Sequence, residues 1–542
     1  MDRLIVANAS AFFGDRLTAP REMIDGGPID VLTGDYLAEL TMALLQRQRS
    51  KGKPGYVPTF LRQAKDILAE CLDRKIRIVT NAGGLDPHGL ANELKKLGAR
   101  VAIVDGDDVL PQFPGAITAN AYLGAWGIRE ALARGADVVI TGRVTDAALV
   151  IGPAAWRFDW SRDDYDRLAG ALIAGHVLEC GTQATGGNYS FFEEVPSFER
   201  IGFPIAEVHA DGSFVVTKHP NTGGLVSVGT VTAQLLYEIA GPRYPSPDVV
   251  ARFDSIEVTQ EGPDRVLVRG ARGEPPPETA KVCVHSFGGF RNEMRVLVPG
   301  PRVEQKIDVL RGMLKERVPA AVQWQLQRSD RDDPETNPEL LATLRLIAID
   351  SDGTRVGRVF SSAVVELATA SIPGISLATP PSDGSPFAVL RTTTIPWSEL
   401  HERLTLDDVV LEISSPSTAP LATDKSIDVD GRAPYPDGDR FGARSGDKGG
   451  DATLGVWARN DEDYAFLRDH LGIARLKELL PEASVVERYP LPNLRAVLFV
   501  LRGLLGDGVS SSTRVDPQAK SLGEWLRARL ISAGARPRGA TT

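Results

Sequence analysis

Short runs of aliphatic and β-branched residues alternate with segments of helical periodicity through the first 150 residues, and this alternation strongly constrains the fold. The apolar runs lie at residues 4–9, 76–80, 101–104 and 138–141. Helical spacing of apolar residues occurs at 37–45, 60–71, 90–97 and 122–133. Strands that alternate with helices form parallel sheets with crossover helices. The sequence therefore predicts an α/β fold with a large, mainly parallel sheet.

The middle of the chain has a different pattern. Residues 205–209 and 214–218 are two strand-like runs, separated by a turn that contains Asp211 and Gly212. An Asp-Gly pair accommodates the positive φ of a tight hairpin, so the two runs are predicted to be antiparallel. This change of pattern suggests that the first domain is subdivided near residues 200–225.

The last part of the chain is predicted to be a separate small domain. Residues 416–438 are rich in Pro, Ser, Asp and Gly without periodicity, which is typical of a linker. Residues 439–536 follow with strand patterns near 453–458, 485–489 and 495–501, and with helical patterns near 464–480 and after Pro517. The expected domains are therefore an α/β domain at 1–415, the linker, and an α+β domain at 439–536.

Charge and composition exclude several classes of protein. A net charge of −10 disfavours nucleic acid as a partner, because that partner requires a basic surface. No apolar stretch approaches the roughly 20 residues that span a bilayer, so no membrane association is expected. Three cysteines cannot all pair, which favours a reducing, cytoplasmic location over a disulfide framework. A symmetric homo-oligomer is expected because such assemblies are common.

Polar residues gather where the predicted strands end. Ligands of parallel sheets bind beyond the carboxyl ends of the strands, where helix N-termini offer unpaired N–H groups. The loop at 81–84 is the clearest case, because its two glycines let the backbone approach an anion. A tight turn that binds nothing is the alternative interpretation. The candidate ligand-binding residues at these strand ends are Asn8, Ser10, Asn81, Gly83, Gly84, Asp107 and Arg143.

Charged groups at two of these strand ends allow both a ligand-binding and a structural interpretation. Arg143 suits bidentate binding of a carboxylate or phosphate, or it neutralises Asp107 or Asp146. The carboxylates at 105–108 are compatible with Mg²⁺ or with a solvated turn. A metal-dependent lyase that uses Asp107, Asp108 and Asp146 is one hypothesis, although no cofactor is assigned.

Further candidates follow in the second half of the first domain and in the small domain. His176 and Glu179 lie three residues apart on a predicted helix, a spacing compatible with an acid/base pair, with metal ligation or with a purely structural contact. Lys218 and His219 precede a Gly-Gly loop and are candidates for binding an anion, such as a phosphate of coenzyme A. Arg444 and Lys448 lie in a polar stretch, predicted to be a loop immediately before a strand. The small domain is expected either to close over the first domain's site or to form a salt-bridged seam with it.

Several motifs resemble a known family. Residues 81–87, 118–126, 141–146, 175–181 and 217–220 are similar to the acyclic terpene utilisation family A proteins. Asn120, within the second of these segments, is also an expected ligand-binding residue. Residues 443–449 and 491–495 resemble the ferredoxin-like domain commonly fused behind them. The resemblance implies a role in degrading acyclic isoprenoids such as citronellol and geraniol through coenzyme A esters, a route that includes biotin-dependent geranyl-CoA carboxylation.

The sequence thus leads to two functional hypotheses. The first is an enzyme of isoprenoid or branched-chain acyl-CoA catabolism, of hydratase, isomerase or lyase type, in which Glu179, Asp146 or His176 moves a proton on an anionic acyl substrate. The second is a noncatalytic protein that binds an acyl-CoA or associates with an acyl-CoA carboxylase. Turnover of acyl-CoA esters by the isolated protein distinguishes the two.

Overall fold

A computed structural model describes residues 3–431, 433–434 and 436–535. The chain divides into a larger compact unit, Met1–His285 with Leu390–Thr542, and a smaller one, Ser286–Val389. The predicted start of the first domain, two positions of the predicted linker (Arg432 and Tyr435) and the predicted end at residue 536 lie outside the described residues. Residues 204–218, in the region where a subdivision is expected, form a hairpin within the main sheet of the larger unit.

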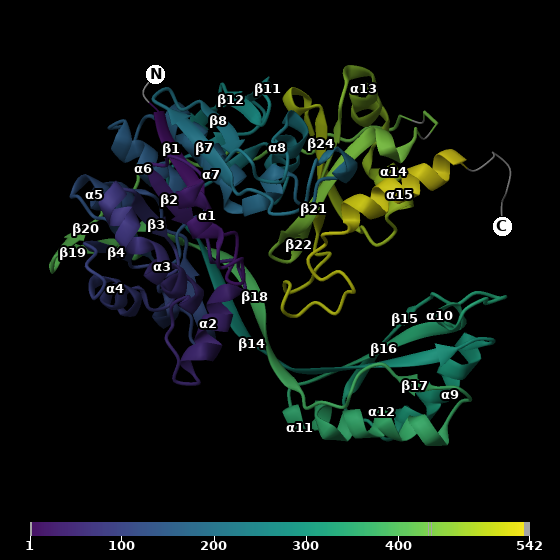
Figure 1. Cartoon of the computed structure of the whole chain (residues 1–542). Helices are drawn as coiled ribbons and strands as arrows, with labels where there is room; N and C mark the ends of the chain where they lie inside the picture. The colour runs from purple at the N-terminus through teal and green to yellow at the C-terminus, as the bar shows by residue number, and fades with distance from the viewer. Residues whose placement is uncertain (1–2, 432, 435, 536–542) are drawn as a thin grey trace. The chain divides into compact units, whose positions relative to one another are not determined.

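The larger unit contains an 11-stranded sheet of order β11-β12-β8-β7-β1-β2-β3-β6-β4-β19-β20 (Figure 1). Its centre is parallel, and both flanks are antiparallel. The predicted hairpin β7–β8 is confirmed and joins β1 edge to edge. The strands are β1 (Arg3–Asn8), β2 (Val31–Gly34), β3 (Arg77–Thr80), β4 (Val101–Asp105), β6 (Val138–Thr141), β7 (Pro204–His209), β8 (Phe214–Lys218), β11 (Glu257–Gly262), β12 (Arg265–Arg269), β19 (Arg403–Leu406) and β20 (Val409–Glu412).

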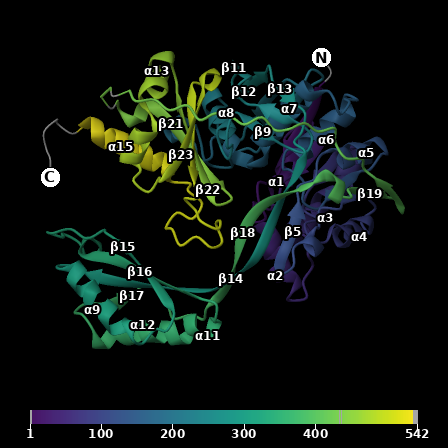
Figure 2. The same ribbon diagram turned by 180° about the vertical axis from the view of Figure 1, so that it is seen from behind.

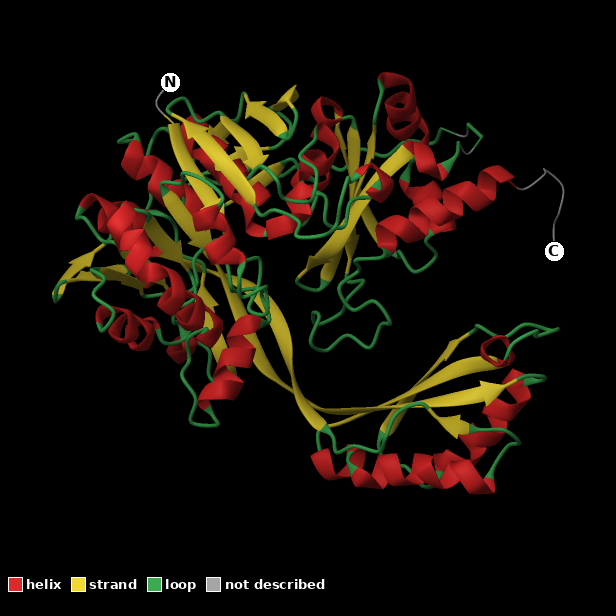
Figure 3. Cartoon of the chain, in the orientation of Figure 1, coloured by secondary structure: helices red, strands yellow, loops and turns green. Residues whose placement is uncertain are grey.

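Helices cover both faces of the central strands (Figure 3). Alternate residues of each strand, such as Val139 and Ile140 of β6, enter cores on opposite faces, as the two-residue period of a strand requires. The α/β fold class is confirmed. One face packs against α5 (Trp126–Ala133), α6 (Ala148–Arg157), α7 (Tyr165–Glu179) and α8 (Val228–Leu235); the other packs against α1 (Ala19–Asp25), α2 (Thr41–Arg49), α3 (Pro58–Arg74) and α4 (Pro87–Lys95).

The C-terminal domain is a four-stranded antiparallel sheet with helices on one face (Figure 2), which confirms the predicted α+β pattern. Residues 444–448 were predicted to be a loop, but they continue β21, which turns at Gly449 and Gly450 into β22. The strand was not predicted because most of its side chains from Arg444 to Lys448 are polar. The elements are β21 (Phe441–Lys448), β22 (Asp451–Ala458), β23 (Val485–Leu491), β24 (Ala496–Arg502), α13 (Asp461–His470), α14 (Ile473–Leu479) and α15 (Leu522–Ala535).

The face of this sheet that carries no helices belongs to the main core of the larger unit. Trp457, Leu498 and Val500 are buried in the same cluster as α7 and α8 residues such as Leu178 and Val231. The two domains therefore share a continuous apolar core, and an ion pair between Arg459 and Glu194 also joins them.

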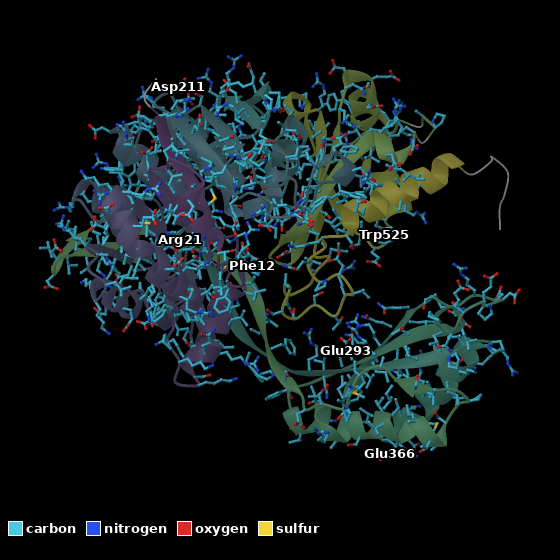
Figure 4. All side chains as sticks on the ribbon, in the orientation of Figure 1. Phe12, Arg21, Asp211, Glu293, Glu366 and Trp525 are labelled. Atoms are coloured by element: carbon cyan, nitrogen blue, oxygen red, sulfur yellow. The ribbon has the colours of Figure 1, made fainter. Side chains whose placement is uncertain are left out.

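The smaller unit is described by itself. A sheet of order β15-β16-β14-β17 packs one face against α9 and α12. Figure 4 labels Glu293, on β14, and Glu366, on α12. Its elements are β15 (Ala321–Gln327), β16 (Leu341–Asp350), β17 (Ser376–Leu377), α9 (Val303–Lys315), α10 (Asn337–Leu340), α11 (Gly353–Val356) and α12 (Arg358–Ala370).

Two long strands, β14 (Thr279–Pro299) and β18 (Ser385–Pro396), carry the chain into and out of the smaller unit. Strand β14 also pairs with β5 (Ala116–Ala121) of the larger unit. A further small sheet in the larger unit consists of β9 (Arg243–Pro245), β10 (Val250–Arg252) and β13 (Arg272–Glu274). Among the described residues, no helix is long and apolar enough to cross a membrane.

The shared core predicts that the two domains of the larger unit unfold together. Leu498→Ala should lower the free energy of unfolding by about 2–5 kcal/mol, as truncation of a fully buried leucine does. Val485→Ala, at a side chain that is 57% exposed on the neighbouring strand, is the control and should change stability little. Hydrogen exchange at increasing denaturant measures both domains at once. Loss of protection in the C-terminal domain alone would contradict the shared core.

Candidate functional site

The loop at 81–84 is packed against protein. A Cβ at Gly83 would collide with the carbonyl oxygen of Thr141 and with the side chains of Pro87 and Ile140. Gly84 has a φ of +50° and packs against Leu45. The glycines therefore let strand ends and a neighbouring helix approach one another. This geometry fits the tight-turn interpretation, and an anion has no open surface at these two positions.

Asn81 joins two strand ends. Its Nδ2 donates to Oδ1 of Asp35 at 2.6 Å, and its Oδ1 accepts from the backbone N–H of Tyr36 at 2.8 Å. Asp86 caps α4 by accepting from the N–H of Gly89 at 2.9 Å. The first turn of α4 thus has its own carboxylate, which takes the place of the anion expected from the sequence.

Asp107 braces two further strand ends. Its Oδ2 accepts from Nδ2 of Asn120 at 2.8 Å and from the N–H of Arg143 at 3.0 Å. Burial raises the pKa of Asp107 to about 6, against the lowering effect of these hydrogen bonds. Asp108 accepts from the N–H of Leu110 at 3.0 Å. Within the described part of the chain, no three His, Cys, Asp or Glu side chains form a group able to hold a metal.

Asn8 supports the end of α7 rather than facing open space. Its Nδ2 donates to the carbonyl oxygen of Leu178 at 2.6 Å, next to Glu179. Ser10 donates to the carbonyl oxygen of Phe12 at 3.1 Å. Both are buried. Their contacts are those of residues that position a neighbouring segment.

Lys218 and His219 also have protein partners. Lys218 Nζ lies 3.1 Å from Oδ2 of Asp264 and donates to the carbonyl oxygen of Thr222 at 3.1 Å. His219 Nε2 donates to the carbonyl oxygen of Met23 at 2.8 Å. The structure does not bring this pair together with the other candidates.

His176 and Glu179 form a buried pair at the end of α7. His176 Nε2 lies 3.1 Å from the carbonyl oxygen of Gln234, which can only accept, so Nε2 carries a proton. Nδ1 lies 3.2 Å from Oε1 of Glu179 without being aligned as a hydrogen bond. Burial and the charge of Lys448 lower the pKa of His176 to about 4. Burial, Asp146 and Glu238 raise the pKa of Glu179 well above its usual value.

Both shifts favour the neutral forms of the pair. In these forms the imidazole offers a free lone pair on Nδ1, and the carboxyl group of Glu179 carries a proton. A proton acceptor and a proton donor thus lie side by side, an arrangement that serves acid/base chemistry. It is equally what a buried structural pair would adopt, so its surroundings decide its use.

A series of contacts leads from His176 to the C-terminal domain. The His176 and Tyr244 rings lie 5.5 Å apart, and Lys448 Nζ lies 5.4 Å from the Tyr244 ring centre. Gly449, the next residue, donates its N–H to Oε2 of Glu39 at 3.0 Å. Strand β21 therefore delivers an ammonium group beside the His176–Glu179 pair.

The contacts continue to the strand ends of the parallel sheet. Lys281 Nζ donates to Oε1 of Glu39 at 2.9 Å and lies 4.6 Å from the centre of the Tyr122 ring. The guanidinium of Arg143 lies 4.5 Å from the same ring and is paired with Asp146. Arg143 also donates to the carbonyl oxygens of Leu37 and Val144. We call this set the charged ring: Glu39, Tyr122, Arg143, Asp146, His176, Glu179, Tyr244, Lys281 and Lys448.

Most charges of the ring are balanced within it. Burial opposes ionisation of Glu39, but Lys281 and Lys448 lower its pKa to about 2. Arg143 is compensated by Asp146. The ammonium group of Lys448 forms no hydrogen bond or ion pair with any described residue, although it lies within electrostatic range of Glu39 and Glu179. Lys448 is therefore the unpaired cation of the charged ring.

The ring includes several predicted residues and several that were missed. Five predicted residues lie in the charged ring: Arg143, Asp146, His176, Glu179 and Lys448. Five others lie outside it and contact neighbouring strand ends or loops instead: Asn81, Gly83, Gly84, Asp107 and Asn120. Glu39 was missed because strand β2, four residues long and ending in Gly34, was not predicted. Lys281 lies on β14, more than 100 residues after the strand ends, and has no local signal in the sequence.

The packing of Gly83 yields a direct test of the anion-cradle hypothesis. Gly83→Ala should lower the free energy of unfolding by about 1–3 kcal/mol, because the added methyl group forces the ends of β3 and β6 apart. Gly262→Ala, where a Cβ meets nothing within 4 Å, is the control. Denaturant titration measures both variants. A Gly83→Ala protein of wild-type stability that has lost ligand binding would restore the cradle hypothesis.

Comparison with known proteins identifies the family. Residues 4–406 match the acyclic terpene utilisation family protein AtuA, and residues 441–532 match the AtuA ferredoxin-like domain. No curated protein matches the chain. The first match covers well over half of the 542 residues, so the chain belongs to the acyclic terpene utilisation family and carries the ferredoxin-like domain at its C-terminal end.

Proposed function

We propose that this protein is an enzyme of acyclic terpene breakdown that moves a proton on an anionic acyl substrate, carried as a coenzyme A ester, at the charged ring. The observation that carries the proposal is the neutral His176–Glu179 pair beside the unpaired ammonium group of Lys448. Family membership supplies the terpene context.

The three groups suit chemistry next to a thioester carbonyl. Nδ1 of His176 takes a proton from the carbon beside the carbonyl, and the negative charge that develops on the carbonyl oxygen is stabilised by Lys448. The carboxyl group of Glu179 supplies a proton to the neighbouring carbon or to a leaving oxygen. Hydratase, isomerase and lyase reactions all use these steps, so the proposal covers the step that they share.

The remaining members of the ring fix the position of these groups. Glu39 ties Gly449 to Lys281, which holds the end of β21 against the first domain. Tyr122 separates the cations of Lys281 and Arg143. Asp146 was predicted to be catalytic, but it forms an ion pair with Arg143. Its role in this proposal is to raise the pKa of Glu179 and so favour the protonated carboxyl group.

Glu179→Gln tests the proton-donor role. The amide preserves the shape of the side chain but cannot supply a proton, so turnover of acyl-CoA esters should fall by about 10²–10⁴-fold. Glu199→Gln, at an exposed loop position, is the matched control and should retain wild-type turnover. Steady-state kinetics on branched and isoprenoid acyl-CoA esters make the measurement.

Lys448→Met removes the ammonium group and should lower kcat more than it raises KM, because the charge on the carbonyl oxygen develops in the transition state. Lys477→Met, exposed in the same domain, is its control. If the wild-type protein binds acyl-CoA esters but turns over none of them, the noncatalytic alternative replaces this proposal.

The raised pKa of Glu179 predicts a specific pH dependence of stability. Below about pH 4.5 its carboxyl group is protonated in both the unfolded and folded chains. As the pH rises, the unfolded chain loses this proton while the folded chain keeps it, so stability falls until the folded pKa is passed. Glu179→Gln removes this effect, and its stability relative to wild type should increase with pH above about 4.5. Urea titrations between pH 4 and 9 would reveal a constant difference if Glu179 were not perturbed.

A further inference from the structure

One buried arginine differs from all the others. Among the described residues, six arginines are buried, and five of them donate hydrogen bonds to carbonyl or carboxylate oxygens. Arg444 is 5% exposed, and its side chain forms no hydrogen bond or ion pair with any described residue. The five partnered arginines are Arg143, Arg345, Arg475, Arg488 and Arg527.

Arg444 is held in place by an aromatic ring. Its guanidinium lies 4.2 Å from the centre of the Tyr237 ring, and a Cβ at Gly446 would collide with the same ring. Arg444, Gly446 and Lys448 alternate along β21 and so share the face turned toward the first domain. Nη2 of Arg444 is buried without a partner, as is Oε1 of nearby Gln234.

This position adjoins the His176–Glu179 pair. Gln234 donates from Nε2 to the carbonyl oxygen of His176 at 3.1 Å. Burial raises the pKa of the thiol of Cys180, which follows Glu179, whereas Gln234 and the charge of Arg444 oppose this shift.

A buried cation without a partner is unfavourable, because it loses its hydration and gains no opposite charge. Cation–π contact with Tyr237 compensates only part of this loss. A planar guanidinium is completed best by a carboxylate, which accepts two parallel N–H hydrogen bonds.

We propose that Arg444 binds a free carboxylate of the substrate, so that the acyl group carries a second acidic function beside its thioester. The inference rests on the proposed function, because it places this carboxylate next to the proton-transferring pair. Lys448 then faces the thioester carbonyl and Arg444 the distal carboxylate, both from one strand of the C-terminal domain. Arg444 determines specificity and takes no part in moving the proton.

Binding tests the subsite independently of turnover. Adipate, with two carboxylates, and hexanoate, with one, are titrated by calorimetry against the full chain and against Arg444→Met. Both should bind the wild type, and Arg444→Met should weaken binding by at least about 30-fold, as loss of a buried charge pair does. Inorganic phosphate is the third ligand. If phosphate alone bound at Arg444, a free anion would replace the substrate carboxylate and the proposal would be overturned.

Stability provides a control for misfolding. Arg444→Met should keep or raise the Tm of the ligand-free protein, because a methionine removes an unpaired buried charge. Arg488→Met should lower it, since Arg488 donates to the carbonyl oxygens of Leu471, Ile427, Leu467 and Arg468. An equal loss of Tm in both variants, with carboxylate affinity unchanged in Arg444→Met, would contradict the proposal.

Kinetics separates failure of this inference from failure of the proposed function. The wild type should prefer adipyl-CoA to hexanoyl-CoA in kcat/KM, and Arg444→Met should lose that preference. Turnover without any such preference would overturn the carboxylate subsite alone. Carboxylate binding at Arg444 without turnover would overturn the proposed reaction and leave the subsite in place.

Discussion

The face of the C-terminal sheet opposite its helices has no cover within its own domain. Trp457, Leu498 and Val500 would be exposed there if the domain stood alone, and they enter the core of the first domain instead. Small residues make the approach close: a Cβ at Gly455 would collide with Leu236, and one at Gly446 with Tyr237. This burial fixes β21 against the first domain, and the position of both cations on that strand depends on it.

Electrostatic balance distinguishes structural charges from available ones. Arg143 and Lys281 lie at the strand ends where a ligand was expected, but Asp146 and Glu39 neutralise them. After burial, the charge of Asp146 raises the pKa of Glu179, whereas the charge of Arg143 opposes this shift. At this site, the two cations whose side chains pair with no described residue, Arg444 and Lys448, both come from the other domain. The first domain thus supplies the neutralised charges, and the C-terminal domain supplies the two to which the proposals assign a ligand.

Much of the α/β framework could be predicted from hydrophobic periodicity. Strands β1, β3, β4 and β6 are continuous apolar runs that are buried on both faces, and such runs are visible in a sequence. Strand β21 was hidden because its residues from Arg444 to Lys448 are polar on the face that meets the other domain. The glycines at 83 and 84 were interpreted as space for a ligand, whereas neighbouring atoms fill that space. A sequence shows that a position needs glycine but does not show what approaches it.

The candidate site was only partly predictable because its chemistry depends on the register of one strand. Arg444 and Lys448 lie on the same face of β21 because they are four residues apart, and Gly446 between them admits Tyr237. A shift of one residue would turn both cations toward α15 and bring Ala443 and Ser445 to the first domain. Hydrogen bonds between Ser190 and both backbone groups of Ala443, at 2.8 and 2.9 Å, oppose such a shift. The strand's register therefore links the packing of the two domains to the charge that a substrate would meet.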